Sequence, residues 1–244
     1  MIKMMVTSAT YRQSARFTPE SKEKDPLNVL LSRGTRFRLQ GEFIRDQALT
    51  VANILVNEVG GISVKPYQPK GIWNEVSLDK GLRYKQDSGD KLFRRSMYTY
   101  WKRSAPAPNM MIFDAPTRET CVVKRPRTNT PLQALVTLND VHFVEASRMF
   151  AQRIMKEGGD SFERRISMAY LLALSRKPTG EELAICKEVF DKQMASFSQD
   201  AAMATKYLAQ GAAGYDKELD PAELASYTVI TNMILNLDET LTRG

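Results

Sequence analysis

The stretch TPLQALVTLNDVHFVEASRMFAQRIMKEGG (residues 130–159) decides the fold, because it encodes two consecutive helices together with their boundaries. A Thr-Pro-Leu-Gln capping box opens the first helix at residue 131, with proline at the first helical position. We expect this helix to end near residue 138. The Asn-Asp pair at 139–140 ends it and caps a second helix over 141–157, which two glycines close.

The same start signals recur toward the C-terminus. A polar N-cap with glutamate three residues later occurs at 160–163 (DSFE), 179–182 (TGEE) and 220–223 (DPAE). We expect helices from these starts to about 175, 197 and 237, and a further helix over 200–210. Repeated helix starts of this kind predict a mainly α fold, with a helical bundle over residues 130–244.

Residues 1–129 carry a different pattern and predict a long, irregular, loop-rich half. The elements expected there are the end of a buried segment at 1–6, helices over 25–34 and 39–57, short strands at about 62–64 and 73–77, a helix rather than a strand over 92–103, a buried apolar segment at 110–113, and a short helix or strand at 119–123. The apolar start has nothing before it to pack against. We therefore interpret 1–244 as a single domain that begins partway into a larger one.

Charge is concentrated between residues 94 and 127. Eight cations and two acids give this block a net charge of +6, against +7 for the whole chain. The rings of Tyr98, Tyr100 and Trp101 interleave with the arginines. A local field of this kind attracts phosphate, sulfate, carboxylate or an acidic protein face. The structural alternative is a solvated loop, or arginines paired with carboxylates from elsewhere in the chain.

Composition excludes several kinds of site. His142 is the only histidine, so a metal cage of several imidazoles is impossible, and we predict no metal site and a structural role for His142. Cys121 and Cys186 are compatible with a disulfide or with two free thiols, and no CxxCH motif is present for covalent haem. No apolar run approaches the ~20 residues of a membrane span. Residues 1–15 lack the features of a signal peptide, and no known nucleic-acid-binding motif occurs.

Four segments together resemble a known family. They are MVTSATYRQSA (5–15), DPLNVLLSRGTRFRLQGEFIRDQAL (25–49), RRSMYTYWKRSAPAPNMMIFDAPTRETCVVKRPRTNTPLQALVTLND (94–140) and ELASYTVITNMILNLDET (223–240). The chain resembles the C-terminal domain of unknown function 1553, also called the PSD-one domain, of large exported planctomycete and verrucomicrobial proteins.

The resemblance implies a setting rather than a reaction. In that family the domain follows a cytochrome c-like domain, so haem c is expected only in an upstream domain and no cofactor in this chain. It also implies a periplasmic or exported location in bacteria rich in polysaccharide-degrading enzymes. The family supplies no catalytic residues to carry over. This chain lacks the export signal and haem domain, and it has Val141 where a proline commonly follows the Asn-Asp pair.

Three functional hypotheses remain open. The first is a non-catalytic accessory module that binds an anionic, including sulfated, polysaccharide or a partner protein, because arginine forks suit such anions. Its expected ligand-binding residues converge on one open concavity and are Arg94, Arg95, Tyr98, Trp101, Arg103, Arg118, Arg125 and Arg127.

The second hypothesis is an enzyme domain that acts on polysaccharide or sugar, with Asp114 and Glu119 as candidate catalytic carboxylates and Asp140 and Glu145 as further ones. The third is a purely structural scaffold that docks the haem domain or a partner enzyme. In that case the residues before the helix at 131 only fix a loop, and side-chain hydrogen bonds of Asn129 and Thr130 are expected to do so.

Overall fold

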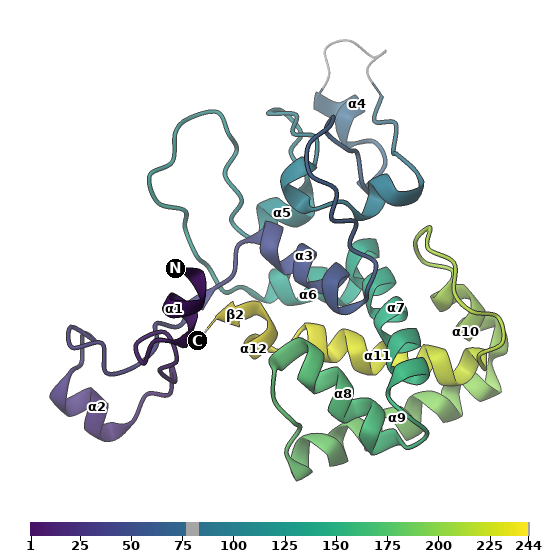
Figure 1. Ribbon diagram of the computed structural model, residues 1–244. Coiled ribbons are helices and arrows are strands. Elements are labelled where there is room, and N and C mark those ends of the chain that lie inside the picture. The colour runs from purple at the N-terminus through teal and green to yellow at the C-terminus, as the bar shows by residue number, and fades with distance from the viewer. Residues whose placement is uncertain (77–82, 244) are drawn as a thin grey trace.

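The computed structural model describes residues 1–76 and 83–243 and has a mainly α fold, which confirms the predicted class (Figure 1). In chain order the elements are α1 (Ile2–Thr7), α2 (Pro19–Lys24), β1 (Phe37–Arg38), α3 (Gly41–Val51), α4 (Ile72–Val76), two 3-10 turns (Gly89–Phe93 and Ser96–Tyr98), α5 (Pro108–Ile112), α6 (Pro131–Asn139), α7 (Val141–Glu157), α8 (Phe162–Leu174), α9 (Gly180–Gln199), α10 (Ala201–Leu208), α11 (Pro221–Leu235), α12 (Asp238–Leu241) and β2 (Thr242–Arg243).

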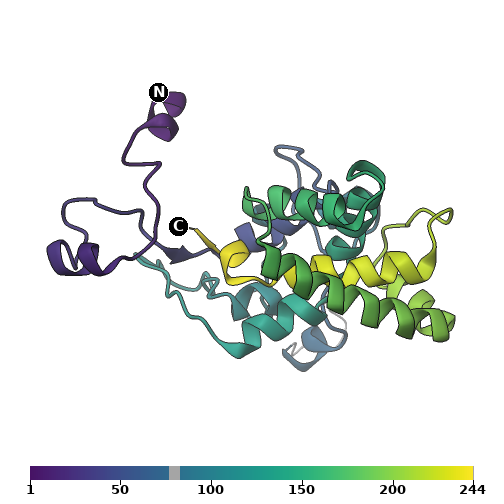
Figure 2. The same ribbon diagram turned by 90° about the horizontal axis from the view of Figure 1, so that it is seen from below.

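Helix α11 forms the centre of the bundle, and α7, α8, α9 and α10 pack around it (Figures 1 and 2). Its side chains are buried on all sides, including Leu224, Tyr227 and Ile230. Helix α7 contributes Phe150 and Ile154 to the same core. A helix that is buried all round belongs to the interior of a domain, so the neighbouring helices form its cover.

Polar side chains fix the contacts of α11 with α6 and α7. Thr231 Oγ1 donates to the carbonyl oxygen of Ser147 (2.8 Å), and Asn232 Nδ2 donates to the carbonyl oxygen of Thr137 (3.0 Å) and to Ser147 Oγ (3.1 Å). All four side chains are buried. Because a buried polar group is costly unless it is hydrogen-bonded, these bonds favour one register of the three helices.

The predicted helix starts of the C-terminal half are confirmed by side-chain caps. In each case a side-chain oxygen accepts a hydrogen bond from a backbone N–H two or three residues ahead, and the capping residues are Asp140, Ser161, Thr179, Asp200 and Asp220. The cap of α8 is Ser161 rather than Asp160, with which the predicted DSFE motif begins, so this helix starts one residue later than predicted. These caps satisfy N–H groups that a helix leaves without intrahelical partners, which is why the boundaries could be predicted.

Helix α6 begins at Pro131 as predicted, but its capping box does not form. Thr130 makes no side-chain cap, so its expected hydrogen bond is absent. Gln133 is buried and donates instead to the carbonyl oxygen of Ile112 (3.0 Å) and to Thr128 Oγ1 (3.1 Å). Tertiary burial of Gln133 therefore replaces the local cap.

The helix predicted over 25–34 is wrong. Asp25 ends α2, and its carboxylate accepts hydrogen bonds from the N–H groups of Val29 (2.7 Å) and Leu30 (3.0 Å). Asn28 and Leu31 have left-handed backbone angles, with φ of 56° and 54°. The aspartate offers these N–H groups an alternative to a helix, so the segment folds as a compact loop.

The helix predicted over 92–103 is also wrong, and Arg45 of α3 gives the reason. Its buried guanidinium donates to the carbonyl oxygens of Leu92 (2.6 Å) and Arg94 (3.0 Å) and to Ser96 Oγ (3.1 Å). An α-helix through this segment would use those carbonyls internally. The segment forms two short 3-10 turns instead.

Other expectations for the N-terminal half had mixed outcomes. The buried apolar segment at 110–113 is confirmed for Met110 and Phe113. The segment at 1–6 is an exposed helix rather than a buried one. Residues 72–76 form α4 in place of a strand, and residue 77 lies outside the described part. Residues 119–123 form neither helix nor strand, and the helix over 39–57 is shorter than predicted, since α3 ends at Val51.

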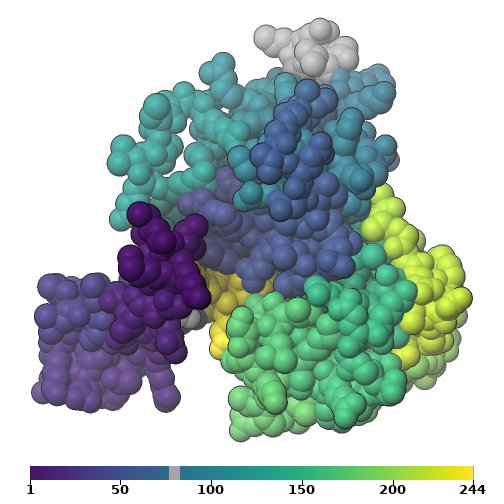
Figure 3. Space-filling view, in the orientation of Figure 1, coloured from purple at the N-terminus to yellow at the C-terminus, as the bar shows by residue number. Residues whose placement is uncertain are grey.

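A two-residue antiparallel pairing joins the segment that follows the first 35 residues to the C-terminal residues. Phe37 pairs with Arg243, and Arg38 pairs with Thr242. Residues 1–35, which we call the arm, precede this pairing and project to one side of the bundle (Figures 1, 2 and 3). The pairing therefore places the base of the arm next to α12 and the C-terminal residues.

Candidate functional site

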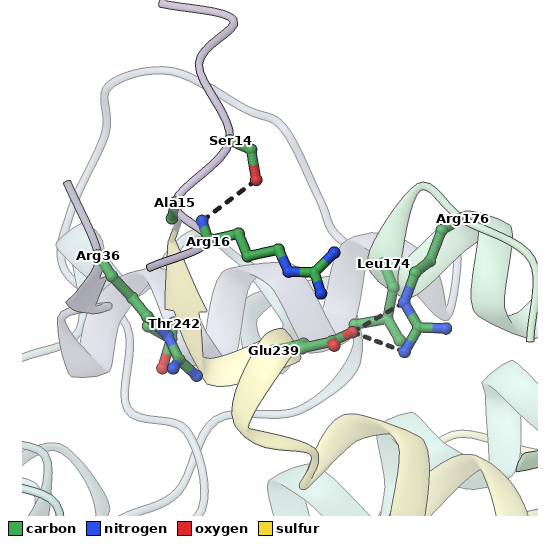
Figure 4. Close-up of a pocket in the computed structure, with 8 residues that line it drawn as sticks. All are labelled: Ser14, Ala15, Arg16, Arg36, Leu174, Arg176, Glu239 and Thr242. Atoms are coloured by element: carbon green, nitrogen blue, oxygen red, sulfur yellow. Dashed lines mark hydrogen bonds and ion pairs between the residues drawn. The ribbon is translucent and has the colours of Figure 1, made fainter. Parts of the chain in front are cut away.

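The candidate site is a pair of neighbouring hollows beside the β1–β2 pairing, which we call the arginine cleft. Their volumes are about 390 Å³ and about 420 Å³, and both are lined by Arg36 and Thr242. The first lies between the arm and the bundle, where Arg16 extends from the arm toward Glu239 and Arg176 (Figure 4). The arginines that line the two hollows are Arg16, Arg36, Arg38, Arg127 and Arg176.

The arginine cleft has more cations than acids. Arg36 and Arg38 share one carboxylate, that of Asp238. Arg176 is fully paired, because it contacts both Glu182 (2.6 Å) and Glu239 (2.8 Å). Within residues 1–76 and 83–243, Arg16 and Arg127 have no carboxylate within 4.0 Å. The cleft is therefore positively charged, and its unpaired guanidinium groups can bind an anion.

Arg127 is held in place by an aromatic ring and by the loop in front of α6. Its guanidinium carbon lies 4.5 Å from the ring centroid of Phe37 in β1. The following residue, Thr128, donates its N–H to Asp114 Oδ2 (2.6 Å) and its hydroxyl to the same carboxylate. Thr128 and Asn129 line the second hollow beside it. Asp114 therefore fixes the loop segment that carries Arg127.

Two of the predicted ligand-binding residues hold a loop of this same chain. Arg94 is buried and donates to the carbonyl oxygens of Glu58 (3.0 Å), Gly60 and Ile62 (3.2 Å). Its guanidinium carbon lies 4.1 Å from the ring centroid of Tyr98, whose hydroxyl accepts from the N–H of Gly60 (2.8 Å). These contacts organise the loop at 58–62 and leave little of either group for a ligand.

The next predicted residues lie on separate surfaces. Arg95 contacts Asp46 (3.8 Å) and lines a hollow on α3. Trp101 donates its Nε1–H to the carbonyl oxygen of Thr117 (2.9 Å), and the guanidinium of Arg118 covers its ring at 4.5 Å. Arg103 is exposed and lines none of the hollows described here.

Arg125 is bound to α3. Its Nη1 contacts Glu42 Oε2 (2.9 Å) and Gln40 Oε1 (2.9 Å). Arg125 and Arg127 line one small enclosed hollow, and Arg127 extends from there to the arginine cleft. The eight predicted residues thus do not converge on one concavity, and Arg127 is the one that lines the cleft.

Sequence reasoning missed the other arginines of the cleft. The alternation Arg36-Phe37-Arg38 places two cations on one side of a strand, and this pattern was the available signal. Its pairing partner lies about 200 residues away in the sequence, at residues 242–243. Nothing in the local sequence indicates that contact, nor the approach of Arg16 from the arm.

The candidate catalytic carboxylates either make hydrogen bonds within the fold or lie in an exposed loop. Asp114 has a left-handed backbone (φ 60°) and binds Thr128. Glu119 is exposed in the loop between α5 and α6. Glu145 is buried on α7 and accepts hydrogen bonds from the N–H of Ala213 (2.6 Å) and the hydroxyl of Tyr67 (3.1 Å). No hollow described here brings two of these carboxylates together.

Asp140 and His142 form a closed pair at the start of α7. Asp140 Oδ1 contacts His142 Nδ1 (2.7 Å) and also accepts from the backbone N–H of His142 (3.0 Å). Burial lowers the pKa of His142, because the effect of desolvation outweighs that of the Asp140 carboxylate, which acts to raise this pKa. Burial acts to raise the pKa of Asp140, but hydrogen bonds from His142 and the charge of Arg45 hold it below its usual value. Asp140 is the N-cap of α7, and the His142 side chain is buried beside it.

No group of three or more His, Cys, Asp or Glu side chains is arranged to hold a metal ion in residues 1–76 and 83–243. Cys121 is exposed and Cys186 is buried, and both are free thiols. None of the helices in the part of the chain that the structure describes is both long and apolar enough to cross a bilayer.

Comparison with known proteins gives one match. A family model described as "Protein of unknown function (DUF1553)" matches residues 1–190, which include the arm, the loop-rich half and the bundle as far as the middle of α9. The tail segment at 223–240 lies outside that match. No curated protein and no solved structure matches the chain significantly.

Proposed function

This chain belongs to the DUF1553 family of proteins of unknown function, and on that premise we propose that it is a non-catalytic accessory module that binds an anionic polysaccharide in the arginine cleft. The module acts within an exported protein that also carries a cytochrome c-like domain. This setting rests on the family resemblance alone. The binding role rests on the cleft.

One observation carries the binding proposal. Two adjoining hollows on either side of Arg36 contain guanidinium groups from three distant segments, and those of Arg16 and Arg127 have no carboxylate partner in the described residues. Guanidinium groups bind sulfate and carboxylate in a planar, two-point geometry. Adjoining hollows suit a chain ligand with repeated charges better than a single small anion.

Neutral groups beside the cations favour a sugar over an inorganic ion. Asn129 lines the second hollow with an amide that can donate and accept hydrogen bonds, and Thr128 and Thr242, whose hydroxyls donate to Asp114 and Asp238, line it with oxygens that can accept them. Sugar hydroxyls need partners of this kind. The ring of Phe37 lines the same hollow and supports the Arg127 guanidinium.

The test is binding to dextran sulfate, with uncharged dextran of the same length as the reference. We expect saturable binding to dextran sulfate that weakens as salt is added, because exposed charges are screened at high ionic strength. Arg127→Ala should weaken binding by roughly five- to tenfold, since it removes a charge-assisted contact. Arg103→Ala is the matched control, because it removes an exposed arginine outside the cleft.

Equal loss in the Arg127→Ala and Arg103→Ala variants would mean that net charge alone attracts the polymer, and the assigned site would then be wrong. Absence of salt-sensitive binding in the unmodified protein would remove the proposal altogether. Circular dichroism of both variants controls for folding, since neither side chain is buried.

A further inference from the structure

The arm presents an unusual group of aliphatic side chains to solvent. Leu27, Val29, Leu30 and Leu31 lie in the loop that follows α2, and we call them the apolar loop. Their exposed fractions are 84%, 76%, 76% and 55%. Isolated exposed leucines are common on proteins, but a contiguous exposed apolar group marks an interaction surface.

The apolar loop is held in one conformation by polar bonds on its inner side. Asp25 accepts from the N–H groups of Val29 and Leu30 and from Ser32 Oγ (3.2 Å). Arg33 Nη1 donates to the carbonyl oxygen of Asp25 (2.8 Å), and Asn28 Nδ2 donates to that of Arg33 (2.9 Å). The loop is therefore already ordered before any contact is made, which reduces the entropy lost on binding.

The arm that carries the apolar loop is positively charged. The arm contains six cations and three acids, a net charge of +3. A hollow of about 510 Å³ at the base of the arm is lined by Arg16, Arg33 and Arg36 and also by Asn28 of the loop itself. No carboxylate lines this hollow. The apolar loop and a hollow lined by three arginines therefore adjoin on the same projecting segment.

We infer that the arm docks on an anionic phospholipid surface, with the apolar loop inserted at the level of the headgroups and lipid phosphates in the Arg16–Arg33–Arg36 hollow. The arm projects from the bundle as a separate lobe, so a planar surface can reach it (Figures 2 and 3). Stable membrane binding by a peripheral segment requires both an apolar and a cationic contribution, and the arm supplies both.

The charge of the arm favours a lipid surface over a second copy of the chain. Two arms that packed against each other would bring two net charges of +3 together, and like charges at an interface are unfavourable. The apolar loop is also a projecting tip rather than a hollow, so two copies of it do not form complementary shapes. An anionic lipid layer satisfies both the charge and the shape.

The experiment is vesicle co-sedimentation of the full chain. The vesicles are phosphatidylcholine with 30% phosphatidylglycerol, and pure phosphatidylcholine vesicles are the reference. We expect binding to the anionic vesicles. Leu27→Ser with Leu30→Ser should weaken it by about tenfold or more, because burying a leucine side chain contributes strongly to transfer from water. Lys22→Ala, which removes an exposed cation from the last turn of α2 just before the apolar loop, should weaken it by roughly fivefold.

The matched control is Leu135→Ser, which removes an exposed leucine (56%) from α6 on the bundle and should leave vesicle binding within about twofold of the original protein. The double leucine variant should still bind dextran sulfate, which separates the apolar loop from the arginine cleft. Analytical ultracentrifugation of the same variants reports whether the loop joins two copies.

Three results would overturn the inference. One is an absence of binding to the anionic vesicles. Another is equal loss in the double leucine variant and in Leu135→Ser. The third is a dimer that the double leucine variant dissociates in the absence of lipid, since the loop would then be a protein interface. In the double leucine variant, loss of vesicle binding with retained dextran sulfate binding supports the lipid surface, whereas retention of both leaves the proposed function standing and removes this inference.

Discussion

Gly211, in the loop between α10 and α11, provides the sharpest test of the structure. Its backbone is left-handed (φ 84°), and a Cβ placed there would overlap the carboxyl group of Glu145 and lie 2.8 Å from Glu145 Cγ. Glu145 is buried and cannot move to solvent without losing its hydrogen bonds from Ala213 and Tyr67. Gly211→Ala should therefore displace the side chain that joins the loop, the bundle and the irregular half.

The size of the effect follows from these contacts. A left-handed alanine costs about 1 kcal/mol. Each hydrogen bond to a buried carboxylate contributes about 1.5 kcal/mol or more, and two are disturbed. The expected loss is about 4 kcal/mol, a large part of the roughly 5–15 kcal/mol that stabilises a domain. For a chain of this size the melting temperature should fall by about 8–16 °C.

Urea unfolding followed by circular dichroism measures this loss, and Gly214→Ala is the matched control in the same loop. A Cβ at Gly214 meets no atom within 4 Å, and its φ is outside the left-handed range. That variant should stay within about 0.5 kcal/mol of the original protein or gain slightly. If the two glycine variants unfold at the same urea concentration, the close packing of the loop on Glu145 is wrong.

The remaining predictions concern single side chains. Arg94→Met should destabilise the protein by about 3 kcal/mol, because it leaves three carbonyl oxygens of the 58–62 loop without a donor. The control variant Arg103→Ala should change the free energy of unfolding by less than about 0.5 kcal/mol. Thermal denaturation of the two variants measures the difference. The Arg176 guanidinium lowers the pKa of Glu182 from 4.5 to about 2, so this group stabilises the fold above pH 4.5, and the contribution is lost as the pH falls through 2. Glu182→Gln should lower the free energy of unfolding by about 1 kcal/mol at pH 7, allowing for solvent screening. In urea titrations the difference in this free energy from the original protein should shrink between pH 4.5 and 2. A difference that stays constant with pH would contradict the ion pair. Gly180→Ala should stabilise the protein by about 0.5 kcal/mol, because a Cβ there meets nothing and helix α9 gains a better helix former, and a lower melting temperature would count against that helix start.

The bundle could be predicted from sequence because its boundaries are local. Asp140, Thr179 and Asp220 each cap a helix through N–H groups two or three residues away, so the whole signal lies within one turn of chain. The central position of α11 was not read from the sequence. Its residues pack on every side, and burial of this kind gives no amphipathic period.

The loop-rich half could not be predicted in the same way, because side chains distant in sequence determine its backbone. Arg45 binds the carbonyl oxygens of Leu92 and Arg94 across nearly fifty residues. The Pro-containing helix start at residue 25 does not produce a helix, because the Asp25 carboxylate binds N–H groups of its own loop. Helix propensity is a weak prior where such contacts compete with it.

The same reasoning explains why the arginines chosen from the sequence do not converge on one concavity. Arg45, Arg94 and Arg148 are buried, and each donates to two or more backbone carbonyl oxygens of an irregular segment. A loop-rich half has many carbonyls without a strand or helix partner, and a guanidinium with five donors can satisfy several at once. Within residues 1–76 and 83–243, Arg16 and Arg127 are the cleft arginines without a carboxylate partner, and they remain available to an anion. A cluster of arginines in an irregular segment therefore indicates internal hydrogen bonds to loop carbonyls before it indicates a binding surface. The surface charge should be counted only from the arginines that do not make such bonds.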